Sequence, residues 1–192
     1  MSNYSGLSNT TFNGGTYNDG VAIEVGMIFN SSIAGNIVAV QYYRTSSMNG
    51  THTGILYDLT GTTTYGSVVF QNTSAVGWVV ATFSSPISIS AGTSYVVAVH
   101  HSDGNYAATT NGFASPIINS VITIPANNTV INNVSRPNGL YIYSTTPKFP
   151  TSTYNANNYW VDVILSSTAS VTSATYSVLS NRTITGGNFN DN

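Results

Sequence analysis

Acidic residues are scarce in this sequence, and their positions limit the catalytic chemistry that it supports. The 192 residues include six acids, of which Asp19 and Asp103 lie in turn sequences, where an aspartate bonds its own backbone. A glycosidase needs two carboxylates across a cleft, and a serine hydrolase needs a nucleophile elbow with its partner histidine and acid. Neither arrangement is recognisable, so the sequence predicts a protein that is not an enzyme and has no catalytic residues.

Glu24 and Asp162 each fall inside an otherwise apolar segment, out of phase with most of its apolar residues. If the two segments lie side by side, the carboxylates face each other and need a cation, an arginine or a raised pKa. Three interpretations are open: bonds to solvent or backbone, pairing with Arg44, or a Ca²⁺ site, because Ca²⁺ prefers carboxylate and carbonyl oxygens. No other cofactor is predicted.

The three histidines do not predict a shared metal site. His100 and His101 are adjacent, so in a regular strand they point to opposite faces. His52 lies in the run Gly50-Thr51-His52-Thr53-Gly54, where it either orders a loop by hydrogen bonding or contacts a ligand.

Tyrosine is the most abundant aromatic residue, with 13 copies beside 2 tryptophans and 7 phenylalanines. A tyrosine ring has an apolar face and a polar edge, which suits it to stacking on the C–H surface of a sugar. Tyr154, in an Asn-rich loop, and Tyr106, after a turn, are the best candidates for ligand contacts. Asp103 and Asn105 are the polar candidates beside Tyr106, whereas Trp78 and Trp160 are expected in the core.

The spacing of apolar residues predicts strands and no helix, because no stretch keeps a 3.6-residue period for three turns. Gly/Asn/Asp turn signals separate the strands, which predicts an all-β, antiparallel two-sheet sandwich that is jelly-roll-like. The predicted strands cover residues 21–29, 36–44, 53–59, 65–71, 77–83, 87–90, 94–101, 117–124, 139–143 and 159–165.

Only 5% of the residues are charged and the formal charge is −2, so the sequence predicts no nucleic-acid partner. A surface of hydroxyls and amides is typical of extracellular, cell-surface or virion proteins. The first residues have neither a basic start nor an apolar stretch, so we expect no signal peptide in this chain and no membrane insertion. The absence of cysteine excludes disulfides and thiolate metal sites.

Changes in amino-acid composition and apolar pattern divide the chain into three parts. Residues 1–12 are predicted to form an N-terminal arm and residues 13–165 the β-sandwich module. Residues 166–192 are Ser/Thr-rich and are predicted to be a linker with an extended arm or added strand. One interpretation is an arm that pairs with the sheet edge of a neighbouring molecule. The other is that the segment is a tail or the start of another module.

Several motifs in order resemble the domain of unknown function 4082 family, a bacterial surface or extracellular β-sandwich module. They are Asp19-Gly20 with Ala22–Phe29, Ile37–Arg44 with Gly50–Gly54, Gly77-Trp78, Ile89–Tyr95, Tyr95–His101 with Asn105-Tyr106, and Phe149–Val163. The resemblance implies a non-catalytic module of large secreted proteins, often beside adhesion-like and carbohydrate-active domains. It implies a binding role with no agreed ligand.

Two functions are therefore predicted. The first is a surface-displayed module for recognition or adhesion that binds a glycan or cell-surface polymer. The alternative is a structural subunit of a virion or extracellular assembly, such as a decoration, fibre or filament protein. It would self-associate or contact assembly partners through its C-terminal arm.

Overall fold

The computed structural model describes residues 2–167, and these form an antiparallel two-sheet sandwich without helices. The smaller sheet has the spatial order β1 (Asn3–Tyr4), β16 (Val161–Ser167), β4 (Gly35–Arg44) and β7 (Gly77–Ile89). The main path of the larger sheet has the order β10 (Ile117–Asn119), β11 (Ile122–Ile124), β3 (Ile23–Ser31), β8 (Ser94–His101), β5 (His52–Asp58) and β6 (Thr64–Val69). The predicted fold class is confirmed.

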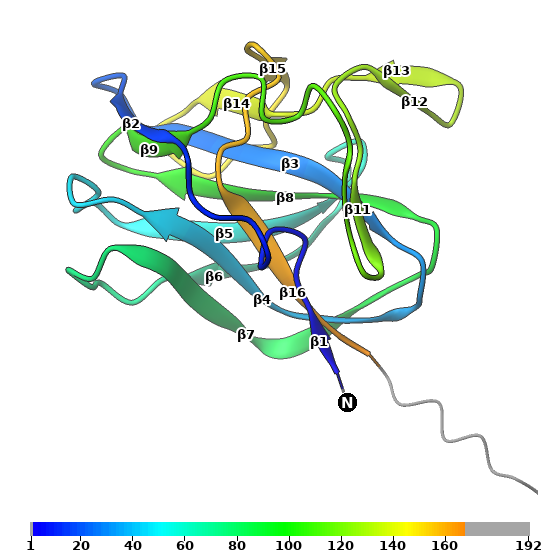
Figure 1. The fold of residues 1–192 in the computed structure, drawn as a ribbon. Coiled ribbons are helices and arrows are strands. Elements are labelled where there is room, and N and C mark those ends of the chain that lie inside the picture. The colour runs from blue at the N-terminus through cyan, green and yellow to red at the C-terminus, as the bar shows by residue number, and fades with distance from the viewer. Residues whose placement is uncertain (1, 168–192) are drawn as a thin grey trace, which may run out of the picture.

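Shorter strands surround these sheets (Figure 1). β14 (Leu140–Tyr143) pairs with the first half of β3 and with β15 (Ser152–Thr153). Two separate ribbons are formed by β2 (Gly15–Asn18) with β9 (Asn105–Ala108), and by β12 (Thr129–Ile131) with β13 (Val134–Arg136). In Figure 1 the β2–β9 ribbon lies at the upper left and the β12–β13 hairpin at the upper right.

The main core lies between the two sheets, where Val25, Phe29 and Val97 of the larger sheet and Val40 and Val163 of the smaller are fully buried. A second cluster covers the outer face of the larger sheet. It contains Ile28, Ile55, Tyr57, Val96, Ala98 and Leu140. The larger sheet is therefore buried on both faces, which explains why β3 and β8 are apolar almost throughout.

Two strand predictions need correction. Residues 77–83 and 87–90 form the single strand β7, which tolerates Pro86 because it is an edge strand with a register shift opposite Ile37–Ala39. The predicted strand 117–124 is the hairpin β10–β11, which turns at Ser120 with a φ of 55°.

Part of the predicted N-terminal arm belongs to the sandwich. β1 pairs with β16 at the edge of the smaller sheet, and Leu7 is fully buried. At the other end, β16 continues to Ser167, two residues past the predicted end of the module. The rest of the predicted C-terminal arm, residues 168–192, lies outside the described residues. Within residues 2–167, no helix has the length and apolarity to cross a membrane.

Candidate functional site

Six tyrosines and one acid surround a cavity of about 420 Å³ where β2, β9 and β14 come together. We call it the tyrosine pocket. It is lined by Tyr17, Asp19, Ile23, Tyr106, Tyr141, Tyr143, Tyr154 and Tyr159. The tyrosines come from distant parts of the chain, so the pocket exists only in the folded protein.

Strand pairing places the rings. Tyr17 of β2 is the register partner of Tyr106 of β9, and their rings stack with centroids 5.8 Å apart. Tyr141 and Tyr143 alternate along β14, so both lie on one face, with ring centroids 5.6 Å apart. Tyr159, just before β16, packs its ring edge against Tyr106. The walls of the pocket are therefore aromatic and mutually supported.

The Asp19 carboxylate is the charged group of the pocket. The hydroxyls of Tyr106 and Tyr143 both donate to Asp19 Oδ2, over 3.1 and 2.8 Å. The hydrogen bond from Tyr143 to Asp19, together with burial, raises the pKa of Tyr143 to about 12. Burial and the Asp19 charge also raise the pKa of Tyr106. Both phenols thus stay protonated at neutral pH and keep donating to Asp19.

A pair of turns holds Asp19 in place. The Asp19 N–H donates to Gly104 O, and Asn18 Nδ2 donates to Asn105 Oδ1 over 2.8 Å. Gly104 has a φ of +69°, and a Cβ there would lie 2.5 Å from Val21 O. Only glycine allows the two turns to approach this closely.

The predicted ligand residues separate into three groups. Tyr106 and Tyr154 line the tyrosine pocket together, and Tyr154 is 60% exposed. Asp103 and Asn105 do not line it but hold turns beside it. Asp103 accepts the N–H groups of Asn49, Gly50 and Asn105, which outweigh burial and lower its pKa. His52 lines a different cavity.

Sequence reasoning missed Asp19, Tyr17, Tyr141 and Tyr143 as site residues. A usable signal was present, because Tyr17 and Asp19, like Tyr141 and Tyr143, are two residues apart and share a face in extended chain. Nothing in the sequence showed that these two segments lie side by side.

The segments of Glu24 and Asp162 do not lie side by side, because they are strands of different sheets, so the condition for a facing pair is not met. Glu24 accepts the Tyr57 hydroxyl at 2.8 Å and the Lys148 N–H at 2.6 Å. Asp162 accepts backbone N–H groups from Gly6, Leu7 and Val163, the Gln41 amide and the Ser5 hydroxyl.

Arg44 is not the partner of either acid. Its guanidinium donates to Ser74 O, Ala75 O and Asn49 Oδ1. Residues 2–167 contain no group of three or more His, Cys, Asp or Glu side chains placed to hold a metal ion. The geometric argument for a shared Ca²⁺ or arginine therefore fails, and backbone and side-chain bonds take its place.

The two adjacent histidines point to opposite faces, as expected. His101 Nδ1 lies 3.0 Å from His52 Nδ1 inside the sandwich, whereas His100 Nε2 lies 2.9 Å from Ser144 O on the outer side. Trp160 is 1% exposed and belongs to the core, and Trp78 packs half-buried against that core.

In a comparison with protein families, the family described as "Domain of unknown function (DUF4082)" matches residues 9–161. The matched region contains every residue that lines the tyrosine pocket. A comparison with proteins of curated function found no match.

Proposed function

The chain belongs to the DUF4082 domain family, and we propose that it is a non-catalytic, surface-displayed module that binds a glycan through the tyrosine pocket. The observation that carries the proposal is the convergence of two tyrosine hydroxyls on the Asp19 carboxylate inside a cavity walled by aromatic rings. A sugar offers the complementary surface, with hydroxyls for the acid and C–H faces for the rings.

The polar groups of the pocket suit sugar hydroxyls. Asp19 Oδ2 is occupied by Tyr106 and Tyr143, while Oδ1 accepts no bond from any of residues 2–167. A ligand hydroxyl therefore has a free carboxylate oxygen to donate to, and such charge-assisted bonds are the stronger ones.

The rings are accessible to a ligand. Tyr17, Tyr143 and Tyr154 are 43%, 51% and 60% exposed, and the rings of Tyr17 and Tyr143 pack against Tyr106 and Tyr141. A cavity of about 420 Å³ is within the usual range for small-molecule sites and suits one or two sugar units.

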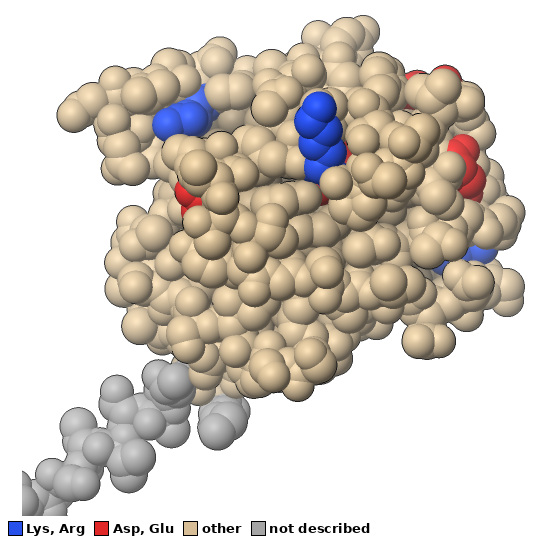
Figure 2. All heavy atoms as spheres, turned by 180° about the vertical axis from the view of Figure 1, so that it is seen from behind, with Lys and Arg blue, Asp and Glu red and all other residues tan. Residues whose placement is uncertain are grey.

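Binding without hydrolysis is supported by the acid content of the pocket. Asp19 is the one carboxylate among the described residues that line it, and glycoside hydrolysis ordinarily uses two. An extracellular, cell-surface or virion location is supported by the surface. Figure 2 shows a face on which charged side chains are few and scattered.

The test is a glycan array followed by calorimetric titration of the best ligand. We expect Asp19→Asn, Tyr106→Ala and Tyr154→Ala each to weaken binding by about tenfold or more, or ~1.4 kcal/mol. Tyr65→Ala is the matched control, because Tyr65 is a 44% exposed tyrosine that does not line the pocket. Folded variants that bind as tightly as the parent, or an array without any bound glycan, would contradict the proposal.

The alternative function, a structural subunit that assembles through residues 166–192, stays a prediction. Only Ser166 and Ser167 of that segment are described, and they pair within the chain, with β1 and β4. The structure adds nothing in its favour, so glycan binding is the function that we propose first.

A further inference from the structure

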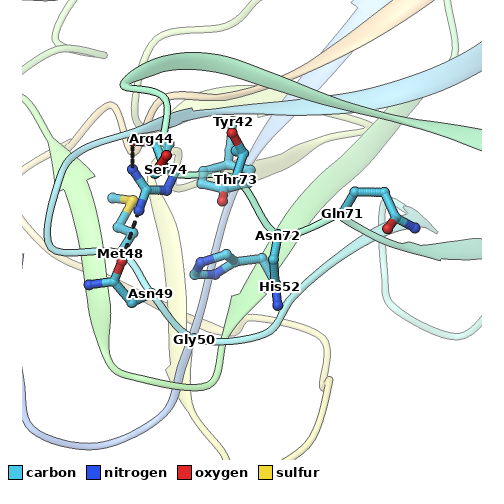
Figure 3. Close-up of a pocket in the computed structure, with 10 residues that line it drawn as sticks. All are labelled: Tyr42, Arg44, Met48, Asn49, Gly50, His52, Gln71, Asn72, Thr73 and Ser74. Carbon is cyan, nitrogen blue, oxygen red and sulfur yellow. Dashed lines mark hydrogen bonds between the residues drawn. The ribbon is translucent and has the colours of Figure 1, made fainter.

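A second cavity, of about 330 Å³, lies away from the tyrosine pocket and shares no residue with it. It is lined by Tyr42 and Arg44 of β4, His52 of β5, and Met48, Asn49 and Gly50 of the loop between these strands. Gln71, Asn72, Thr73 and Ser74 of a second segment complete the set of lining residues drawn in Figure 3. We call it the arginine pocket.

Arg44 places a buried positive charge in this pocket. It is 3% exposed, and its three hydrogen bonds go to neutral acceptors: Ser74 O at 3.0 Å, Ala75 O at 3.3 Å and Asn49 Oδ1 at 2.9 Å. A guanidinium has five N–H donors and stays charged. Two of these donors therefore have no acceptor among residues 2–167.

His52 places an unpartnered nitrogen at the same cavity. The side chain is 4% exposed, and in Figure 3 its ring points in toward the other lining residues. Its Nδ1 lies 3.0 Å from His101 Nδ1, and its buried Nε2 makes no hydrogen bond of normal geometry with residues 2–167, although the Met48 backbone lies close enough to the ring to act on its pKa. An unpaired buried polar atom costs stability, so it points to a group that the protein itself does not supply.

The histidine pair can present a donor at this nitrogen. Burial lowers the pKa of both rings, so both are neutral at neutral pH. One of the two Nδ1 atoms then carries a proton and donates it in a hydrogen bond to the other. When His101 Nδ1–H is the donor, His52 carries its proton on Nε2. Nε2 then donates a hydrogen bond to an acceptor in the cavity.

The second segment of lining residues, 71–74, is polar and uncharged. The amides of Gln71 and Asn72 are exposed and bond no side chain or backbone group of residues 2–167. Asp103, the acid whose charge acts on His52, does not itself line the cavity, and it accepts the backbone N–H groups of Asn105 and of the lining residues Asn49 and Gly50. The cavity is thus bordered by a buried cation, a buried imidazole and exposed amides that make no other bond among residues 2–167.

We propose that the arginine pocket binds the carboxylate of a small hydroxylated organic acid, of the sugar-acid class. The carboxylate accepts from Arg44 and from His52 Nε2–H, and the ligand hydroxyls bond Gln71 and Asn72. Arginine is suited to this role because its planar fork matches a carboxylate. This inference does not depend on the tyrosine pocket.

The test is a titration of the ¹⁵N-labelled full chain followed at the imidazole nitrogens and at Arg44 Nε. The probes are sodium glucuronate and glucose, which differ in a single group, carboxylate against CH₂OH, at matched ionic strength. The chain has three histidines, so His52 is assigned by single substitution. We expect saturable His52 and Arg44 shifts with glucuronate, at up to about 10 mM ligand, and none with glucose.

Arg44→Lys keeps the charge and loses the fork, so we expect glucuronate to bind about tenfold more weakly. His100→Gln is the matched control, because His100 bonds Ser144 O on the outer side of the larger sheet, and it should bind glucuronate like the parent. The double variant Tyr106→Ala, Tyr154→Ala should retain the His52 shifts, which separates this site from the tyrosine pocket.

Two outcomes on the unmodified chain overturn the proposal without any variant: no saturable His52 shift with glucuronate, or equal shifts with glucose. Unchanged affinity in a folded Arg44→Lys chain also overturns it, as does loss of the His52 shifts in the tyrosine double variant.

Discussion

At the scale of single residues, two acids among residues 2–167 are fully buried, and each is stabilised by hydrogen-bond donors close to it. Glu24 lies on the outer face of the larger sheet, opposite the core-facing Ile23 and Val25, and Asp162 occupies the equivalent outer position in β16. Burial raises the pKa of both, to about 7 for Glu24.

This shift makes stability depend on pH. Between pH 4.5 and 7 the folded chain holds a proton on Glu24 that the unfolded chain releases, so the free energy of unfolding falls as pH rises through this window. We expect the contribution of Glu24 to be about 3 kcal/mol smaller at pH 8 than at pH 4. Urea denaturation across this range measures it.

Glu24→Gln is the control, because an amide keeps the shape and does not titrate. The difference in unfolding free energy between the parent and Glu24→Gln should change with pH in the sense just given. A constant difference from pH 4 to pH 8 would show that Glu24 does not titrate in this window. The subtraction removes the contribution of Asp162, whose pKa is also raised.

At the scale of elements, the first residues of the chain complete the smaller sheet. β1 pairs with β16, and the segment after it brings the N–H groups of Gly6 and Leu7 onto Asp162 at 3.0 and 2.9 Å. A Cβ on residue 6 would lie 3.2 Å from Asp162 Oδ1, which favours glycine at this close approach. Residues 2–7 therefore add an edge strand to the smaller sheet and supply hydrogen-bond donors to a buried carboxylate.

Two truncations separate these contributions. Removing residues 2–4 takes away β1 only, whereas removing residues 2–7 also takes away the Ser5, Gly6 and Leu7 donors and the buried Leu7 side chain. We expect the longer truncation to cost at least about 3 kcal/mol more, from unmet bonds at Asp162 and lost apolar burial. Urea denaturation of the two chains gives the comparison, and equal midpoints and slopes would contradict it.

At the scale of the whole molecule, the residues that we describe as lining the two pockets all lie within residues 2–167. A chain that ends at Ser167 should therefore bind the glycan of the tyrosine pocket with an affinity within about twofold of the full chain, or ~0.4 kcal/mol. Calorimetric titration of the two chains with the same glycan tests this expectation. Loss of binding on truncation would show that the tyrosine pocket alone does not account for recognition.

The same pair of chains tests the assembly alternative through their masses by light scattering. A multimer that becomes a monomer when residues 168–192 are removed would support an assembly role. Equal monomer masses would contradict it and leave glycan binding as the function to pursue.

Much of the architecture was determined by the sequence alone. Runs of apolar residues bounded by turn signals identified the long strands β3, β4, β5, β8 and β16, and in β3 and β8 these runs are almost continuous because both faces are buried. The alternation of residues along a strand also placed Glu24 and Asp162 away from the core-facing residues. The short strands β1, β2, β9, β12, β13 and β15 were not predicted, since they have two to four residues and contain few consecutive or alternating apolar side chains.

Only the tertiary structure decided what those residues do. The tyrosine candidates Tyr106 and Tyr154 were recognised singly, but their pocket required Asp19 and β14, which lie far from them in sequence. Arg44 and His52 likewise share a pocket only in the folded chain, because they lie on strands of different sheets. A local pattern reports which face of a strand is buried, whereas a binding site depends on which strands are neighbours. In an antiparallel sandwich those neighbours are set by long-range pairing, which no local pattern contains.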